Sequence, residues 1–287
     1  MEMCSQQDIT ALDGPDTLIL DPDHPGIHDS EYVARRHEFF NISRAWRLAA
    51  RGIPHIDYRP EEDQVWRSVS HKLRQDHQNH ACSMYLEGKQ ALGFDTEAIP
   101  QPALIDQRLQ KLTGLGLIPA EGLIPFRGFF NYLALRKLPC TQYVRHQSRP
   151  AFTPEPDVIH DMLGHVPQLA NREYVALIAT IGKATKTANE RQLRAFERLY
   201  WFAIEFGLIL ERGKPKMFGA GLLSSYGEMQ HALSDEVQRI PFDMDVLIHT
   251  SYDPSRMQKT LFVIESFQQL NQETEALIAR FENERAS

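Results

Sequence analysis

The chain has 287 residues, of which 42% are hydrophobic and 24% charged, the composition of a globular protein with a sizeable core. Its formal net charge of −7 argues against a general nucleic-acid surface, because such surfaces gather Lys and Arg. No apolar run approaches the roughly 18 residues of a membrane span, and the acidic N-terminus lacks a secretion-signal pattern. We therefore expect a cytoplasmic protein that binds neither nucleic acid nor a membrane.

The three cysteines, Cys4, Cys82 and Cys140, form no C-x-x-C pair. Their odd number and wide spacing argue against a disulfide framework or a cysteine-based zinc site. We expect reduced and mostly buried thiols.

Residues 1–29 are rich in Asp, Pro and Gly, which predicts an extended lead-in. No linker divides the rest of the chain. We expect an extended N-terminal segment at 1–20 and one domain at 21–287, mainly α with a few short strands.

Helical signals dominate after the lead-in. Ser30 is expected to cap a helix that stops at Gly52. Pro60, followed by three acidic residues, predicts the first turn of a second helix, and residues 103–113 predict a third. Segment 141–146 contains β-branched and aromatic residues in alternation and predicts a short strand.

The second half of the chain carries two capping-box patterns. Asn189 with Gln192 predicts the start of a long apolar helix, and Ser225 with Glu228 predicts the start of another. Residues 257–281 predict a final amphipathic helix.

Two histidines, His160 and His165, lie five residues apart. Five residues rotate about 140° on an ideal α-helix, so the two side chains would not share a face. Gly164 and Pro167 can end or distort a helix near the second histidine and let its ring swing back. The pair alone is weak evidence for a metal, because two ordinary polar histidines are the more common case.

Glu205 is the only charged residue in the run 199–210. If the run is helical, the neighbours three and four positions away are all apolar: Trp201, Phe202, Leu208 and Ile209. A carboxylate in such surroundings is costly unless it is protonated, paired with a cation such as Arg145, or bound to a metal.

Two imidazoles and one carboxylate are the facial triad of non-haem iron(II) oxygenases, which leaves positions on the metal open. A zinc hydrolase that uses the same histidines is the weaker alternative, because H-E-x-x-H needs histidines four apart and a glutamate beside the first. A non-catalytic protein that binds an amino acid or a partner is a third possibility, and it would not need all three ligands.

The chain resembles the pterin-dependent aromatic amino acid hydroxylases over roughly residues 20–280. The segments that carry the resemblance keep the family's order and spacing: Asp23–Gly26, His80–Cys82, Tyr143–His146, Thr153–Asp157, His160–Pro167, Leu199–Gly207 and Gly219–Ser225. The resemblance implies the family's catalytic fold. It also implies that His160, His165 and Glu205 bind Fe(II), with dioxygen as co-substrate.

For the substrate, the resemblance implies that Arg145 binds the carboxylate of a free aromatic amino acid through its bidentate fork. Trp201 and Phe206 are expected to line the ring pocket, with Thr153 and Ser224 on the same side. Ser224 is also similar to a serine that supports an iron-ligating histidine.

For the cofactor, the resemblance implies a tetrahydropterin, either tetrahydrobiopterin or a related bacterial pterin. The expected contacts are Gly122, Leu123, Ile124, Phe129, Asp161 and Tyr200, with Phe129 stacking on the pterin ring. Taken without the family, each of these aromatic residues could equally belong to the core. No protein side chain is expected as catalytic acid or base.

We expect L-phenylalanine as substrate and L-tyrosine as product, because Trp201 matches the phenylalanine and tyrosine enzymes. Hydroxylation of tryptophan at ring position 5, or of phenylalanine at position 3, remains the alternative. The chain is expected to be a monomer that acts on a small molecule.

Overall fold

The computed structural model describes residues 18, 20, 22–49, 52–94, 96–151, 155–254 and 256–286. Cys4, Thr153 and nearly all of the expected N-terminal segment 1–20 lie outside these ranges. Cys82 and Cys140 are free and buried, as expected. Within the described residues, no helix is both long and apolar enough to cross a membrane.

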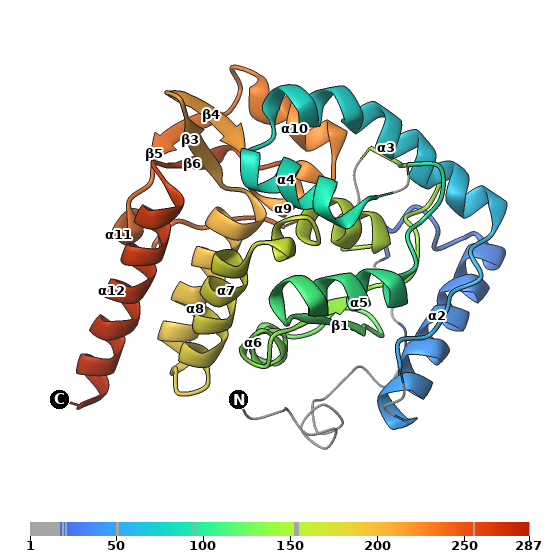
Figure 1. Ribbon diagram of the computed structural model, residues 1–287, viewed down its shortest axis with the longest axis horizontal. Coiled ribbons are helices and arrows are strands. Elements are labelled where there is room, and N and C mark those ends of the chain that lie inside the picture. The colour runs from blue at the N-terminus through green and yellow to red at the C-terminus, as the bar shows by residue number, and fades with distance from the viewer. Residues whose placement is uncertain are drawn as a thin grey trace.

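Most of the described chain is helical (Figure 1). The longer helices are α2 (Ser30–Ala49), α3 (Pro60–His80), α4 (Ser83–Leu92), α5 (Pro102–Thr113), α6 (Phe126–Ala134), α7 (Arg172–Thr185), α8 (Glu190–Leu199), α10 (Tyr226–Leu233) and α12 (Phe267–Ala286). The shorter turns are η1 (His160–His165), η2 (Gln168–Ala170), η3 (Tyr200–Glu205), α9 (Ala220–Leu223) and α11 (Met244–Leu247). This confirms a mainly α fold with a few short strands.

Two small sheets complete the fold. β1 (Gly116–Pro119) pairs in parallel with β2 (Lys137–Cys140). The second sheet has the order β4-β3-β6-β5 and is formed by β3 (Leu208–Glu211), β4 (Lys214–Met217), β5 (Gln238–Pro241) and β6 (Thr260–Ile264). β3 and β4 form an antiparallel hairpin, whereas β6 runs parallel to both β3 and β5.

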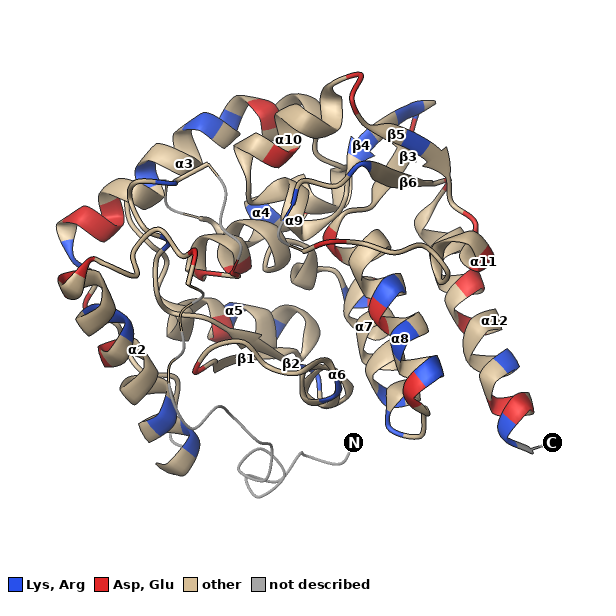
Figure 2. Ribbon diagram, turned by 180° about the vertical axis from the view of Figure 1, so that it is seen from behind, with Lys and Arg blue, Asp and Glu red and all other residues tan. Residues whose placement is uncertain are grey.

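One continuous apolar core joins these elements. It includes side chains from α3 to α8, from both sheets and from α12, with Trp66, Tyr85 and Phe130 among the fully buried ones. On the outside, acidic and basic residues alternate along α8 and α12 rather than gathering by sign (Figure 2). This core reaches from α3 to α12, and Phe39 of α2 packs in a separate small cluster with Ile56 and Tyr143.

Three of the expected helix starts are confirmed, and only one of them, that of α2, has a different capping residue. α3 begins at Pro60 and α8 begins after Asn189, whose capping box with Gln192 is complete. At α2 the cap is Asp29 instead of Ser30, because Asp29 Oδ1 accepts from the first free backbone amides of the helix. α2 ends at Ala49, before Gly52.

The predicted strand at 141–146 is wrong. Side chains bind its backbone where a strand would have a neighbouring strand: Asp161 accepts from the amide of Thr141, and Asp157 accepts from the amide of Arg145. The carbonyl of Tyr143 accepts from the amide of Val158. The segment is thus an extended loop tied to the residues that lead into η1.

The predicted helix at 257–281 is wrong in its first part. Residues 260–264 form β6, the central strand that pairs with both β3 and β5, and the helix begins only at Phe267. The other expected capping box is half present, because Ser225 accepts from the amide of Glu228 at the start of α10.

Candidate metal centre

A wide helical turn brings the two histidines together. In η1 the amide of Val166 donates to the carbonyl of Asp161, five residues back, which is the hydrogen bond of a π-helix. Residues five apart therefore lie on one face of this turn. The sequence-based expectation that the histidines meet is confirmed, but the backbone stays helical and widens instead of ending at Gly164.

Gly164 allows the neighbouring turn to approach. A Cβ at this position would lie 2.5 Å from the carbonyl oxygen of Ala220, far inside van der Waals contact. Because Gly164 has no side chain, α9 can lie directly against η1. Ser224, the residue after α9, is thereby placed beside His160.

A second π-turn presents Glu205. α8 continues into η3, where the amide of Phe206 donates to the carbonyl of Trp201. The helix ends at Glu205, so Leu208 and Ile209 belong to β3 and are not its helical neighbours as expected. The expectation of an enclosed carboxylate still holds, because the Glu205 side chain is only 13% exposed.

The three side chains converge on one point. The Nε2 atoms of His160 and His165 are 3.1 Å apart. Glu205 Oε1 lies 3.0 Å from His165 Nε2, and Oε2 lies 3.6 Å from His160 Nε2. Within the described residues this is the group of histidine, cysteine and acidic side chains that could hold a metal ion.

These separations fit a single ion. Ligand atoms at right angles, each about 2.1 Å from a metal, lie about 3.0 Å from one another. Two nitrogen donors and one carboxylate oxygen also match the donor set of a ferrous facial triad. The residues therefore suit such an ion in both spacing and chemistry.

Ser224 fixes which nitrogen of His160 faces the centre. The Ser224 hydroxyl donates to the carbonyl of Ala220 at 2.8 Å and lies 3.0 Å from His160 Nδ1. Because the hydroxyl has one proton and gives it to the carbonyl, His160 Nδ1 must be the donor to Ser224. His160 Nε2 is then left with its lone pair toward the metal position.

The surroundings shift the pKa values of His160, His165 and Glu205 in different directions. Burial lowers the pKa of His160 to about 4, which keeps its imidazole neutral. Burial also opposes a charge on His165, but Glu205 outweighs it and raises the pKa of His165. Burial would raise the pKa of Glu205, but His165 and then His160 lower it overall. The site thus contains an ionised carboxylate that attracts a cation.

Arg145 does not pair with Glu205. Its Nε and Nη2 donate to the two oxygens of Asp157 at 3.0 and 2.8 Å, and Nη1 donates to the carbonyl of Pro150. Burial would raise the pKa of Asp157, but Arg145 outweighs it and lowers that pKa. Arg145 is therefore not the partner of Glu205, and the ion pairs of Glu205 found within the described residues are those with His160 and His165.

Asp157 also connects Arg145 to the metal centre, a role that the sequence reading missed. Its Oδ1 accepts from the backbone amide of His160 at 2.9 Å, as a residue does when it caps a helix three positions ahead. The spacing Asp-x-x-His before a helical run was the available signal. The fully buried carboxylate of Asp157 thus fixes the position of both the Arg145 side chain and the first residue of η1.

Aromatic side chains stack beside Glu205. Trp201 lies against Phe206 with ring centroids 4.8 Å apart and is stacked on Tyr252 at 4.3 Å. Trp201 Nε1 donates to Gln258 Oε1 at 3.1 Å. The structure brings the expected Trp201 and Phe206 together and adds Tyr252 and Gln258, which no local pattern in the sequence pointed to.

A second group of aromatic side chains, Tyr200 and Phe129, begins beside His165. Tyr200 lies 6.3 Å from the ring of His165, and Phe129 meets Tyr200 edge-on at 5.2 Å. Ile124 reaches the first turn of α6 near Gly128, so the loop Gly122, Leu123 and Ile124 adjoins the helix that carries Phe129. Leu123 itself is exposed.

Asp161 lies on the far side of η1 from solvent. Its Oδ2 accepts from both the amide and the hydroxyl of Thr141 at 2.7 Å. Burial raises its pKa to about 7, although these hydrogen bonds and His165 favour the charged form. Asp161 therefore ties the loop at 141 to η1, the turn that carries His160 and His165.

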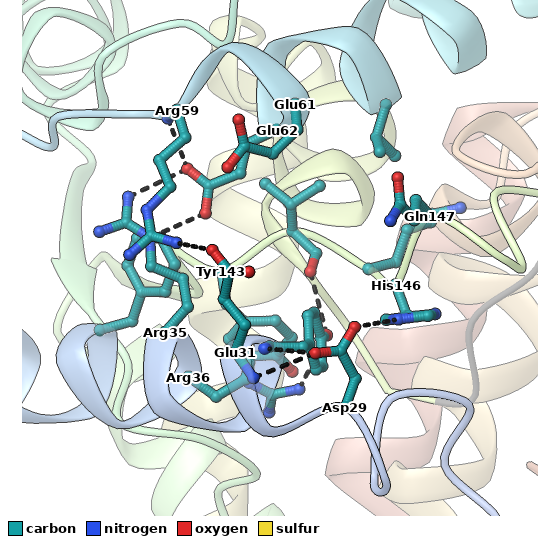
Figure 3. Close-up of a pocket in the computed structure, with 15 residues that line it drawn as sticks. Asp29, Glu31, Arg35, Arg36, Arg59, Glu61, Glu62, Tyr143, His146 and Gln147 are labelled. Carbon is teal, nitrogen blue, oxygen red and sulfur yellow. Dashed lines mark hydrogen bonds and ion pairs between the residues drawn. The ribbon is translucent and has the colours of Figure 1, made fainter.

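A cavity of about 280 Å³ lies on the outer side of Arg145, between α2, the start of α3 and the loop at 143–147. Figure 3 shows its charged residues turned toward one another, with Asp29 between His146 and the start of α2, and Arg59 beside Glu62. None of the three metal donors lines this cavity. It adjoins the candidate site but is separate from the metal centre.

Comparisons with known proteins agree with this geometry. The model of the biopterin-dependent aromatic amino acid hydroxylase family matches residues 6–285. The chain is 38% identical over 258 residues to tyrosine 3-monooxygenase of Schistosoma mansoni, covering 88% of this chain and 55% of that protein. It is 39% identical over 252 residues to phenylalanine-4-hydroxylase of Rattus norvegicus, covering 86% and 55%. The chain thus spans about half the length of these relatives.

Solved structures give the same result. Phenylalanine hydroxylase of Chromobacterium violaceum with bound iron(III) and 7,8-dihydrobiopterin superposes with a TM-score of 0.73 at 33% identity, covering 79% of this chain and 84% of that one. The apo form of the cold-active phenylalanine hydroxylase of Colwellia psychrerythraea gives 0.73 at 30% identity, covering 79% and 90%. This chain belongs to the biopterin-dependent aromatic amino acid hydroxylase family.

Proposed function

We propose that this chain hydroxylates the ring of a free aromatic amino acid, with dioxygen as co-substrate and a tetrahydropterin as reductant. The observation that carries the proposal is the convergence of His160, His165 and Glu205 on one point, with spacing that suits a ferrous ion. When bound there, the ferrous ion and the pterin together supply the activation of dioxygen.

The chain's own residues would bind and orient the reactants. Arg145 is the proposed anchor for the substrate carboxylate. Asp157 and Pro150 accept three of its five N–H groups, which leaves one on each terminal nitrogen for a two-pronged contact. Because Asp157 also binds the amide of His160, it would hold the anchor in register with the metal.

The aromatic side chains would exclude water and hold the flat reactants. Trp201 and Phe206 are proposed to line the substrate-ring pocket, with Thr153 on the same side. Phe129 is proposed to stack on the pterin, with Gly122, Leu123, Ile124, Asp161 and Tyr200 completing its surroundings. A dry, ordered pocket favours transfer to the ring over reaction with water.

Among aromatic amino acids we propose L-phenylalanine, converted to L-tyrosine, so that the enzyme would be a phenylalanine 4-monooxygenase. The phenylalanine hydroxylases among the structural neighbours support this choice. Tyrosine 3-monooxygenases are similar at the same level of identity, so the substrate needs a direct test. The test is mass spectrometry of the products from phenylalanine, tyrosine and tryptophan, each with ferrous ion, oxygen and a tetrahydropterin. A product from tyrosine or tryptophan but not from phenylalanine would overturn the choice.

The anchor has its own test. We expect Arg145→Lys to raise the KM for the amino acid by at least tenfold, because an ammonium cannot reproduce the two-pronged contact. Arg194→Lys, at an exposed position of α8, is the matched control. An unchanged KM in the first variant would place the carboxylate elsewhere.

We also propose that the chain works as a monomer in the cytoplasm. Size-exclusion chromatography with light scattering measures the mass directly. A particle near the chain mass of 33.0 kDa is the expected result, and a stable tetramer would contradict it.

A further inference from the structure

An open hollow of about 500 Å³ lies between the end of α3 and α4, and nothing in the metal centre uses it. Its lining includes two basic residues, Arg74 and Lys89, one histidine, His77, and two apolar residues, Leu86 and Phe94. In Figure 1, α3 runs along the rim of the molecule and α4, which follows it in the chain, lies toward the centre of the view. The hollow is therefore distinct from the cavity beside Arg145.

His77 has a fixed protonation pattern. Its Nε2 lies 2.7 Å from the carbonyl oxygen of Leu223, and a carbonyl only accepts, so Nε2 carries the proton. Burial first, then Lys89, lowers the pKa of His77 to about 3, so the ring is neutral at ordinary pH. His77 Nδ1 is left as an acceptor at the base of the hollow.

Lys89 is held by that acceptor. Its Nζ lies 3.1 Å from His77 Nδ1 and 5.9 Å from the centre of the Tyr85 ring. One N–H of the ammonium is therefore directed at His77, and its other donors remain available. These contacts hold the Lys89 side chain in place but do not neutralise its positive charge.

Neither basic residue of the hollow has an acidic partner among the described residues. Arg74 donates to the hydroxyl of Thr96 at 2.9 Å, and Lys89 contacts only His77 and the Tyr85 ring. Burial first, then Arg74, lowers the pKa of Lys89 to about 8. Among the described residues, two cations are thus held near each other without an acidic partner, which is unfavourable for buried or half-buried charges.

In the cavity beside Arg145, by contrast, the arginines are paired with acidic side chains. Each of its arginines pairs with a carboxylate at 2.8 to 3.2 Å: Arg35 with Glu62, Arg36 with Glu155, Arg59 with Glu31, and Arg145 with Asp157. Figure 3 shows Arg35 and Arg59 near Glu62 in this arrangement. Every arginine that lines that cavity has an acidic partner, whereas neither cation of the hollow has one within the part of the chain that the structure describes.

We propose that the hollow at Lys89 binds a small phosphate monoester, with its phosphoryl group at Lys89 and Arg74 and its apolar part against Leu86 and Phe94. A phosphoryl group carries up to two negative charges near neutral pH, which matches two cations better than a single carboxylate does. Charge-assisted hydrogen bonds from an ammonium and a guanidinium are the usual way in which proteins bind such a group. The inference does not depend on the hydroxylase reaction.

The experiment uses the iron-loaded full chain and phenyl phosphate as the probe, at constant ionic strength and pH 7.5. Isothermal titration calorimetry is expected to show a saturable site. Lys89→Met removes the charge at similar volume and is expected to weaken that binding at least tenfold. Lys111→Met, at an exposed lysine of α5, is the matched control and should bind normally. The comparison also separates the hollow from any binding of the probe at the metal, which both variants retain.

Two further probes, compared with phenyl phosphate, define the ligand class. Inorganic phosphate should bind more weakly than phenyl phosphate because it lacks the apolar part, and benzoate should bind more weakly because it carries a single charge. If benzoate binds more tightly than phenyl phosphate, the phosphate assignment is overturned. Equal weak effects of all three that follow ionic strength alone would overturn the site itself.

A second measurement does not depend on variants. Labelling of the wild-type chain with trinitrobenzenesulfonate, followed by peptide mass spectrometry, reports the free amine of each lysine. Lys89 is expected to react faster near pH 8 than exposed lysines, and phenyl phosphate is expected to slow it at least tenfold. If Lys89→Met fails to fold, this protection and the retained binding of Lys89→Arg decide the question. Absence of protection, or full binding by a folded Lys89→Met, would overturn the proposal.

Discussion

Ser224 and Ser225 are neighbours in the chain and serve different parts of the molecule. Ser224 accepts a hydrogen bond from His160 and thereby sets which nitrogen faces the metal position. Ser225 accepts from the amide of Glu228 at the start of α10 and donates to the carbonyl of Ala151. The pair offers a matched comparison between support of a ligand and support of the fold.

We expect Ser224→Ala to weaken iron binding by roughly 10- to 100-fold, because residues that orient a ligating histidine contribute about this much. Ser225→Ala should leave iron binding unchanged and reduce the free energy of unfolding by about 1 kcal/mol, the usual cost of losing a helix cap. Metal titration and thermal unfolding of both variants measure the two effects. Equal iron affinity in Ser224→Ala and the wild type would show that the Nδ1 contact does not matter.

Replacement of Glu205 by Gln tests the donor set. The amide keeps the size of the side chain but loses the negative charge, which His165 and then His160 stabilise by lowering the pKa of Glu205. We expect ferrous affinity to fall by at least roughly 100-fold, beyond the loss seen when an outer partner is removed. Glu190→Gln, at an exposed acid of α8, should bind iron normally. Retention of tight iron by Glu205→Gln would remove the carboxylate from the site.

At the scale of elements, residue pattern predicted several helices but missed α4, α6 and α7 and did not show the two π-turns. The helical spacing of apolar residues and the capping residues predicted α2, α3, α5 and α8, since both signals are local in the sequence. The π-turns at η1 and η3 depend on the close approach of another turn, as at Gly164, and such an approach has no signature in a single sequence. The sequence therefore singled out the three side chains that converge, His160, His165 and Glu205, but not the backbone that brings them together.

The strand prediction for segment 141–146 failed for a similar reason, because its backbone partners are distant in the sequence. Its residue types are typical of a strand, but Asp157 and Asp161 bind its amides, and these acids lie some 12 to 20 positions away. β6 was missed for a related reason, because its pairing with β3 and β5 is long-range. Strand assignments depend on partners, and partners are set by the whole fold.

Gly164 gives the element-scale prediction. A methyl group in Gly164→Ala would meet the carbonyl of Ala220 at 2.5 Å, so η1 and α9 must separate. We expect the free energy of unfolding to fall by about 1 to 3 kcal/mol, as in other overpacked cores. Iron affinity should fall as well, because α9 leads into Ser224. Gly52→Ala has open space around it and serves as the control for both measurements. Unchanged iron affinity would mean that the two turns can move together.

For the molecule as a whole, stability should depend on pH through a buried acid outside the metal centre. Glu228 in α10 is 2% exposed, and its two carboxylate oxygens have no hydrogen-bond partner of good geometry among the described residues. Burial raises its pKa from 4.5 to about 7, and the backbone amide of Gln258 offsets only part of this. The folded state therefore holds the proton more tightly than the unfolded state does.

The sign of the effect follows from linkage. Below pH 4.5 the carboxyl is protonated in both states and costs nothing. Between pH 4.5 and 7 the folded chain binds more protons, so the free energy of unfolding falls as the pH rises, by about 3 kcal/mol at most for a shift of this size. Glu228→Gln removes this titration, so we expect the variant to be about 1 to 3 kcal/mol more stable than the wild type at pH 8 and to lose the advantage by pH 4. Glu275→Gln, at an exposed acid of α12, should follow the wild type. Denaturant unfolding of the three proteins at several pH values measures the slopes, and an unchanged slope in Glu228→Gln would show that this carboxyl is ionised in the folded state without cost.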